Sequence, residues 1–352
     1  MALGKKNIVS LCPENYTHVI IGEEKSGKTT LIADIAKTYY GNIESLLCIS
    51  MGKEKGHKAI QGLLYEEPQN WSEFVAVVDE LIQNPDENDF KIVSIDTIDE
   101  LIKMATKEVL RLSRVETGKV CKSLNQAFTG YNAGRDRLAD LINEQLNRLE
   151  NSKYGMFYVG HTKIKNIKQK DGEEYSQLTS NLEQAQFSLF SYNAHFICNI
   201  TNEKVIDENK MLVSSKRYMN FRDNGYVKAG GRFAYFEEHY EYGAENYMGA
   251  VIEALKFARG TDMSDATLKK EQTKELKEKE TNAKAFAQSE STEVETDVIE
   301  LCKAKYSDVA TSVKAEVKGS FSKYGYKNFT DLRSGNNESH IKEIAKILGI
   351  EA

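Results

Sequence analysis

The chain has 352 residues, of which 40% are apolar and 28% charged, and its formal net charge is −6. This length allows one large α/β domain and a smaller module. No apolar stretch approaches the roughly 18 residues of a membrane span, and the N-terminus does not resemble a signal peptide, so we expect a cytoplasmic protein without a membrane anchor. The scattered Cys12, Cys48, Cys121, Cys198 and Cys302 argue against a disulfide framework and a zinc site.

Strands alternate with helices over the first 160 residues. Short apolar runs predict strands at 17–21, 45–51, 90–96 and 156–160. Apolar residues at helical spacing predict helices at 28–39, 71–84, 98–113 and 135–150. This alternation predicts an α/β fold with a mostly parallel sheet that helices cover on both faces.

The pattern changes after residue 160. The polar segment 163–185 shows no clear periodicity, so we expect a long loop there. The β-rich segments 195–201, 211–218 and 232–238 predict an antiparallel extension of the sheet, and a helix over 245–258 closes the domain.

Composition separates the C-terminal part from the rest. Residues 261–300 contain eleven acidic residues and six lysines but few apolar ones, which is typical of a solvated helix or a disordered linker. Apolar residues then recur at helical spacing, among them Val317, Phe321 and Ile344. We therefore expect a core over 1–260, a charged linker over 261–297 and a small helical module over 298–352.

A phosphate-binding motif follows the first expected strand. Gly22-Glu-Glu-Lys-Ser-Gly-Lys-Thr29 fits the pattern GxxxxGK[ST], with a strand before it and a helix after it. Glycines let backbone N–H groups surround phosphates, Lys28 adds a positive charge, and Thr29 offers a hydroxyl to Mg²⁺. The sequence therefore predicts an ATP site with Mg²⁺ and an ATPase activity. Its expected binding residues are Gly22, Glu23, Glu24, Lys25, Ser26, Gly27, Lys28, Thr29 and Thr30.

Acidic residues near this loop are candidates for metal binding and catalysis. Asp96 ends the third strand, where a carboxylate can hold the hydration shell of Mg²⁺, although it could also be a plain helix N-cap. Glu54, after the second strand, is the candidate that activates water. It stands between two lysines, as solvated glutamates often do, and Glu100 is the alternative.

His161 ends the fourth expected strand. A polar side chain at this edge of the sheet can contact the γ-phosphate and transmit its presence to the following segment. The alternative is an ordinary histidine without a functional role.

Two segments are candidates for nucleic-acid binding. The first contains Lys163, Lys165, Lys168 and Lys170 without any acidic residue, followed by aromatic residues. Lysines neutralise phosphates and aromatic rings stack on bases, so this pattern is typical of single-strand binding, although a solvated loop would look the same. The second is 321–329, where aromatic residues alternate with lysines. Those rings could equally form a small core or a protein-docking surface.

Together, these features resemble the RecA-like P-loop ATPases of bacteriophages, particularly the ATP-dependent single-strand annealing proteins. The resemblance rests on the phosphate loop, Asp96, Gly160-His-Thr-Lys163, Ser215-Lys-Arg217 and Gly231-Arg-Phe233, and covers about 17–258. It departs from the family pattern at Gly52-Lys-Glu-Lys-Gly56 and after residue 262.

The resemblance implies a RecA-like core, Mg²⁺-ATP and single-stranded DNA binding, and a homo-oligomer that works with a single-strand-binding protein in the host cytoplasm. It also implies that Lys216, Arg217 and Arg232 reach the ATP of a neighbouring subunit; the alternative is that they are ordinary surface or strand-edge charges. The alternative function is a P-loop DNA motor or regulator, such as a helicase-like or packaging ATPase. A third possibility is a small-molecule kinase, but the sequence shows no arginine-rich lid typical of such kinases.

Overall fold

The computed structural model describes residue 4 and residues 6–53, 55–168, 172–206, 212–329, 332 and 338–350. The chain divides into two compact units, Met1–Asn282 and Ala283–Ala352. Within the described ranges, no helix is long and apolar enough to cross a membrane.

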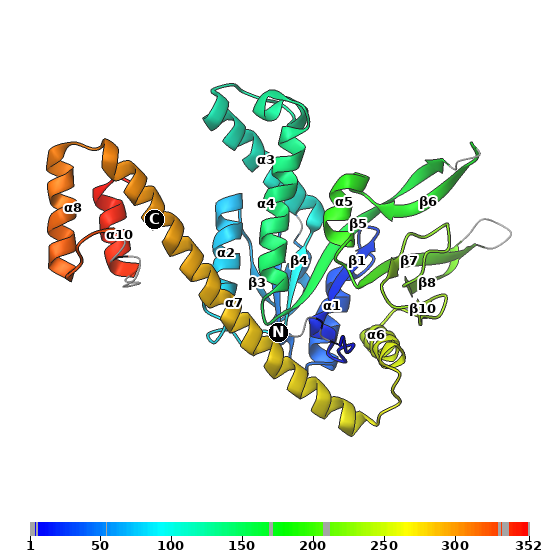
Figure 1. Ribbon diagram of the computed structural model, residues 1–352. Coiled ribbons are helices and arrows are strands. Elements are labelled where there is room, and N and C mark those ends of the chain that lie inside the picture. The colour runs from blue at the N-terminus through cyan, green and yellow to red at the C-terminus, as the bar shows by residue number, and fades with distance from the viewer. Residues whose placement is uncertain are drawn as a thin grey trace. The chain divides into compact units, whose positions relative to one another are not determined.

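A single sheet forms the centre of the first unit (Figure 1), in the order β10-β8-β7-β1-β5-β4-β2-β3. Pairing is parallel from β7 to β3, whereas β8, β9 and β10 pair antiparallel at one side and β6 pairs antiparallel with β5. This confirms the predicted α/β fold with an antiparallel extension. The strands are β1 (Thr17–Gly22), β2 (Leu46–Ser50), β3 (Leu64–Glu66), β4 (Ile92–Asp96), β5 (Gly155–Lys168), β6 (Glu174–Ser180), β7 (Phe196–Ile206), β8 (Leu212–Asn220), β9 (Gly230–Gly231) and β10 (Tyr240–Glu241).

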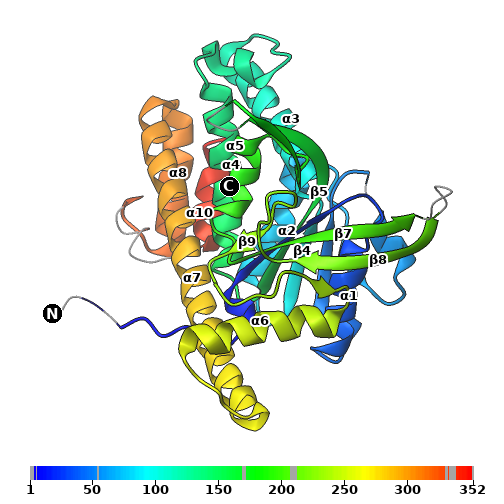
Figure 2. The same ribbon diagram turned by 90° about the vertical axis from the view of Figure 1, so that its right-hand side faces the viewer.

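Helices cover both faces of the sheet. Phe157 and Val159 of β5 share one apolar core with α1 and α6, which lie side by side (Figure 2). Tyr158 points to the other face, where its ring lies 5.7 Å from that of Phe190 in α5. The helices of this unit are α1 (Lys28–Thr38), α2 (Trp71–Gln83), α3 (Ile98–Thr117), α4 (Ala133–Glu150), α5 (Gln184–Ser191), α6 (Ala244–Arg259) and the first part of α7 (Asp265–Asp308).

The segment 163–185 is not the long loop that we expected. It contains the end of β5, the antiparallel strand β6 and the start of α5. Much of the surface of both hairpin strands is exposed, and their residues are mostly polar. Neither strand therefore shows the alternation of apolar and polar residues that marks a half-buried strand. The expectation of a strand over 232–238 is also wrong, since residues 232–239 contain none.

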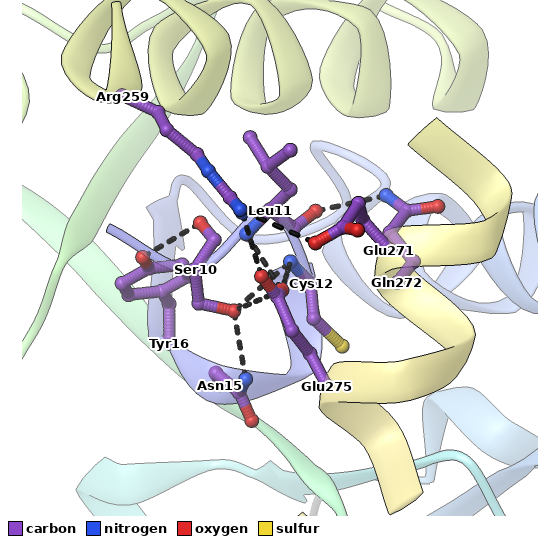
Figure 3. A network of polar contacts seen from close by, with 9 residues as sticks. All are labelled: Ser10, Leu11, Cys12, Asn15, Tyr16, Arg259, Glu271, Gln272 and Glu275. Carbon is purple, nitrogen blue, oxygen red and sulfur yellow. Dashed lines mark hydrogen bonds and ion pairs between the residues drawn. The ribbon is translucent and has the colours of Figure 1, made fainter. Parts of the chain in front are cut away.

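The expected linker falls largely within α7, whose first part packs on the core of the first unit. Leu268 is buried in that core. Figure 3 shows Glu275 accepting hydrogen bonds from the backbone N–H groups of Leu11 and Cys12 and pairing with Arg259 at 2.7 Å. The charged composition of this part of α7 therefore reflects a polar anchor to the N-terminal segment.

The second unit is helical. It contains the end of α7 together with α8 (Thr311–Tyr324) and α10 (Glu338–Ile347), around a small apolar core that includes Val317, Phe321 and Ile344. Phe321 and Phe329 of the aromatic segment 321–329 lie in this core, so these two rings have a structural role.

His18 of β1 is a buried histidine that predicts a pH dependence of stability. Its ring is stacked between Phe157 and Phe196, and burial lowers its pKa to about 3. Below pH 6.5 the unfolded chain binds a proton that the folded chain does not, so stability falls as pH decreases from 6.5 toward 3.

We expect this histidine to contribute about 1.4 kcal/mol per pH unit over that range. Urea unfolding at several pH values should therefore give a shallower dependence for His18→Gln than for the unaltered protein. Equal slopes would show that His18 is not the group responsible.

Candidate nucleotide-binding site

The phosphate loop lies between β1 and α1, at the carboxyl edge of the parallel strands. Gly27 caps α1 with a φ of 97°, a conformation that favours glycine. A Cβ at this position would lie 2.5 Å from Arg217 Nη1 and 2.6 Å from the hydroxyl of Tyr242. The backbone conformation thus favours glycine here, and a Cβ would displace the two side chains that lie over the loop. The loop presents the N-terminus of α1 to an anion.

Lys28 and Ser26 show how this loop fits a phosphate. The Lys28 ammonium group is buried and donates to the carbonyl oxygens of Gly22 (3.1 Å) and Glu23 (2.8 Å), so the loop wraps around its positive charge. The Ser26 hydroxyl is also buried, and it has no hydrogen-bond partner among the described residues. A phosphate oxygen would satisfy this hydroxyl.

Thr29 and Asp96 form a pair of oxygen ligands beside the loop. Asp96 ends β4, which β5 separates from β1, and Thr29 Oγ1 donates to Asp96 Oδ2 at 2.5 Å. Hydroxyl and carboxylate oxygens are the ligands that Mg²⁺ prefers, so these residues would hold the ion. When bound, Mg²⁺ neutralises charge on the β- and γ-phosphates.

The water-activating glutamate stays a prediction. Glu54 lies outside the described residues, although a Cβ on Gly56 would lie 3.0 Å from Thr29 Oγ1, so Gly56 is placed beside the metal ligands. The alternative, Glu100, lies against Gly52 and forms an ion pair with Lys103 at 2.5 Å.

His161 lies beside the phosphate loop, paired in register with Gly22. Its backbone N–H donates to Asp99 Oδ2 at 2.9 Å, and its imidazole Nδ1 lies 3.6 Å from the same oxygen. Burial by itself would raise the pKa of Asp99, but hydrogen bonds from His161 hold it below its ordinary value, so Asp99 is ionised. The carbonyl oxygen of His161 accepts from Asn181 N–H at 2.8 Å, which ties it to the end of β6.

Arg217 lies over the phosphate loop of its own chain. Its guanidinium group stacks on the Tyr242 ring at 4.1 Å and donates to the carbonyl oxygen of Ser26 at 3.3 Å. Tyr242 donates to the carbonyl oxygen of Gly27 at 2.8 Å, and burial raises its pKa, so the hydroxyl remains protonated at neutral pH.

These contacts place Arg217 at the phosphate loop of its own chain and favour a role there. The expectation that it reaches the ATP of a neighbouring subunit stays a prediction, which the mixing experiment below decides. Lys216 points elsewhere and approaches Glu241 at 3.8 Å. Arg232 donates to the carbonyl oxygen of Tyr192 at 2.6 Å, and its backbone bonds to His195, at the start of β7. The start of β7 lies at the edge of the sheet opposite the phosphate loop. Of these three basic residues, the structure therefore brings only Arg217 to the site.

Tyr242 is a site residue that the sequence analysis missed. It stands 215 residues from Gly27 in the chain, and the pairing of β10 with β8 places it beside Arg217. No local motif marks it.

We expect Arg217→Ala to weaken nucleotide binding by about tenfold, because the loop loses a cation. Mixing this variant with Lys28→Ala should restore no ATP hydrolysis, since both side chains serve the loop of one chain and no mixed oligomer would contain an intact site. Lys216→Ala is the matched control and should stay near the unaltered activity. Recovery in mixtures shown to co-assemble would instead place Arg217 across a subunit interface.

Three of the four candidate DNA-binding lysines lie on β5, in the β5–β6 hairpin. Lys163 is exposed, Lys165 donates to the carbonyl oxygen of Leu182 at 2.6 Å, and Lys168 approaches Glu174 at 3.7 Å. Lys170 lies outside the described residues. The hairpin thus presents cations at the edge of the sheet that carries the phosphate loop, but two of them have partners.

Comparison with known proteins agrees with this geometry. A family model described as "AAA domain" matches residues 14–248, which is more than half of the chain and includes every described residue of the phosphate site. A search of curated proteins finds no match. The strand–loop–helix geometry, the Thr29–Asp96 pair and this match show that the chain belongs to the AAA-domain family of P-loop ATPases.

Proposed function

We propose that this ATPase binds single-stranded DNA and promotes strand annealing during recombination of phage DNA. In this proposal it acts as a homo-oligomer and works with a single-strand-binding protein. The observation that carries the proposal is the position of His161, which pairs with Gly22 of the phosphate loop and begins the projecting part of the β5–β6 hairpin.

His161 couples the nucleotide site to the β5–β6 hairpin in this proposal. Asp99 and Asn181 hold its backbone on both sides, so a shift of the His161 backbone on binding of a γ-phosphate would be passed to the end of β6. A cavity of about 640 Å³ lies next to this connection and is lined by Lys53, Asp99, Asn181 and Gln186. The hairpin can therefore respond to the nucleotide, as a DNA-binding element of an ATP-dependent protein should.

The test measures annealing of complementary oligonucleotides with and without ATP. We expect ATP to accelerate annealing in the unaltered protein, and we expect Asp99→Asn to bind ATP but lose this acceleration. Unwinding or translocation without annealing would support a DNA motor instead.

A second test concerns the hairpin lysines. Replacing Lys163, Lys165, Lys168 and Lys170 together with glutamine should weaken single-strand binding. It should also flatten the salt dependence of binding by about 0.7 slope units for each phosphate that the hairpin no longer neutralises. An unchanged slope would show that the hairpin does not contact the DNA backbone.

A further inference from the structure

A second cationic surface lies on the arm formed by residues 103–137, which comprises most of α3, the short helix η4 (Leu124–Thr129) and the start of α4. Figure 1 shows this arm projecting beyond the carboxyl edge of the sheet. It contains eight Lys/Arg and three Asp/Glu residues, a net charge of +5 in a chain whose total is −6. The rest of the chain therefore carries −11, and the arm stands out as a positive region on an acidic protein.

The cations of the arm are available to a ligand. All eight are exposed. Lys103, Arg111 and Arg135 have acidic partners, namely Glu100, Glu108 and Glu183. The others form no ion pair with the described residues: Lys107, Arg114, Lys119, Lys122 and Arg137. A cluster of exposed cations produces a positive surface potential that attracts a polyanion.

The tip of the arm presents an aromatic ring. The side chain of Tyr131 is fully exposed, at 101% of its reference area. Phe128, Thr129, Tyr131 and Asn132 all have positive φ angles, between 49° and 72°, which are costly for residues other than glycine. Such a concentration of unfavourable backbone conformations is typical of a segment held for a function.

Contacts with α3 and α4 hold the tip of the arm in one conformation. The backbone N–H of Phe128 donates to the buried hydroxyl of Ser113 at 2.9 Å, and Ala127 is fully buried. Gly134 lets η4 approach α4, since a Cβ there would lie 2.8 Å from the Cβ of Ala127. These contacts fix the tip that carries Tyr131.

We propose that the arm is a binding site for single-stranded DNA, separate from the β5–β6 hairpin. Its unpaired cations contact the phosphates, and Tyr131 stacks on a base. The Arg135–Glu183 pair, at 3.4 Å, connects the arm to the segment that follows β6, so the two surfaces adjoin. This inference rests on the proposed function, because annealing requires two strands and each chain would offer two adjacent contacts.

The test measures binding of fluorescein-labelled oligodeoxythymidine at several salt concentrations. The arm variant replaces Arg114, Lys119, Lys122 and Arg137 with glutamine. The matched control makes the same change in charge on α7, at Lys269, Lys270, Lys274 and Lys277, which are also exposed. We expect about tenfold weaker binding or more for the arm variant than for the control, and a salt slope lower by about 0.7 for each phosphate that the arm no longer neutralises.

Tyr131 provides a second measurement that does not depend on charge. Because the ring is fully exposed, its removal leaves the packing of the arm intact. Tyr131→Ala should weaken binding by about fivefold, the smaller end of the stacking contribution, whereas Tyr131→Phe should bind like the unaltered protein. Equal binding by the alanine and phenylalanine variants would overturn the stacking role.

The outcomes separate this inference from the proposed function. If the hairpin variant loses binding while the arm variant matches its control, the arm proposal falls and the hairpin assignment stands. If the arm variant loses binding to polyglutamate but keeps its affinity for the oligonucleotide, the arm binds an acidic protein segment and the proposal is overturned. If the unaltered protein binds no oligonucleotide, both proposals fail.

Discussion

Lys28→Ala should abolish ATP hydrolysis, with a fall of at least about a hundredfold. The ammonium group lies inside the phosphate loop, bonded to the carbonyl oxygens of Gly22 and Glu23. No other cation is placed so deeply among the described residues of the loop, since Lys25 is exposed and Arg217 reaches the loop from outside. Without Lys28, charge on the terminal phosphates is no longer neutralised from within the loop.

The fold should survive this substitution, because the hydrogen bonds that it removes belong to a loop and the apolar face of α1 is unchanged. The measurements are phosphate release and thermal unfolding. Lys37→Ala, at the exposed end of the same helix, is the matched control and should leave both unchanged. Normal hydrolysis by a folded Lys28→Ala protein would contradict the assignment of the loop.

The phosphate loop and its strand–helix context could be predicted because the signal is local. Gly22, Gly27, Lys28 and Thr29 stand within eight residues, and their spacing specifies both the turn and the anion site. Asp96 could be placed beside them because parallel strands carry the residues at their carboxyl ends to one edge of the sheet. The structure brings Asp96 to hydrogen-bonding distance of Thr29.

The β5–β6 hairpin could not be read from alternation. Most of the ribbon is exposed, and burial is confined to the end of β6, where two of the three buried residues are polar (Gln177, Leu178 and Ser180), so residues 163–180 show no apolar period that separates a strand from a loop. The strand conformation of β6 depends on its pairing with the end of β5, and this contact cannot be seen in the local sequence. Asp99 was missed as the partner of His161 because it lies in the first turn of α3 and not at the end of a strand, so the rule that placed Asp96 does not apply to it.

The position of Arg217 shows another limit. Its sequence context indicates a cation near an ATP site, but composition and spacing do not say whose ATP site it is. Within one chain, the β8–β10 pairing places Tyr242 against the Arg217 guanidinium group, which favours a role of Arg217 at its own phosphate loop.

Glu275→Ala should produce the largest loss of stability outside the apolar core, about 3 kcal/mol. Its carboxylate accepts from the backbone N–H groups of Leu11 and Cys12 and pairs with Arg259, and the Glu275 side chain is only 14% exposed. Figure 3 shows these contacts gathered around one carboxylate. Its removal leaves the Leu11 N–H without this acceptor beside fully buried side chains, and the Cys12 N–H keeps only its hydrogen bond to the Ser10 hydroxyl.

The matched control is Glu278→Ala, one turn further along α7, where the side chain is exposed and forms no ion pair with the described residues. That change should alter stability by no more than about 0.5 kcal/mol. Urea unfolding of the full chain measures both variants, with the unfolding of the core followed by the fluorescence of Trp71, which is buried in α2. Because Glu275 joins α7 to the N-terminal segment, its loss should weaken the whole ATPase unit. Equal stability of the two variants would contradict the anchoring role of Glu275. It would then support the sequence-based expectation that the core ends near residue 260 and that the first part of α7 is a linker.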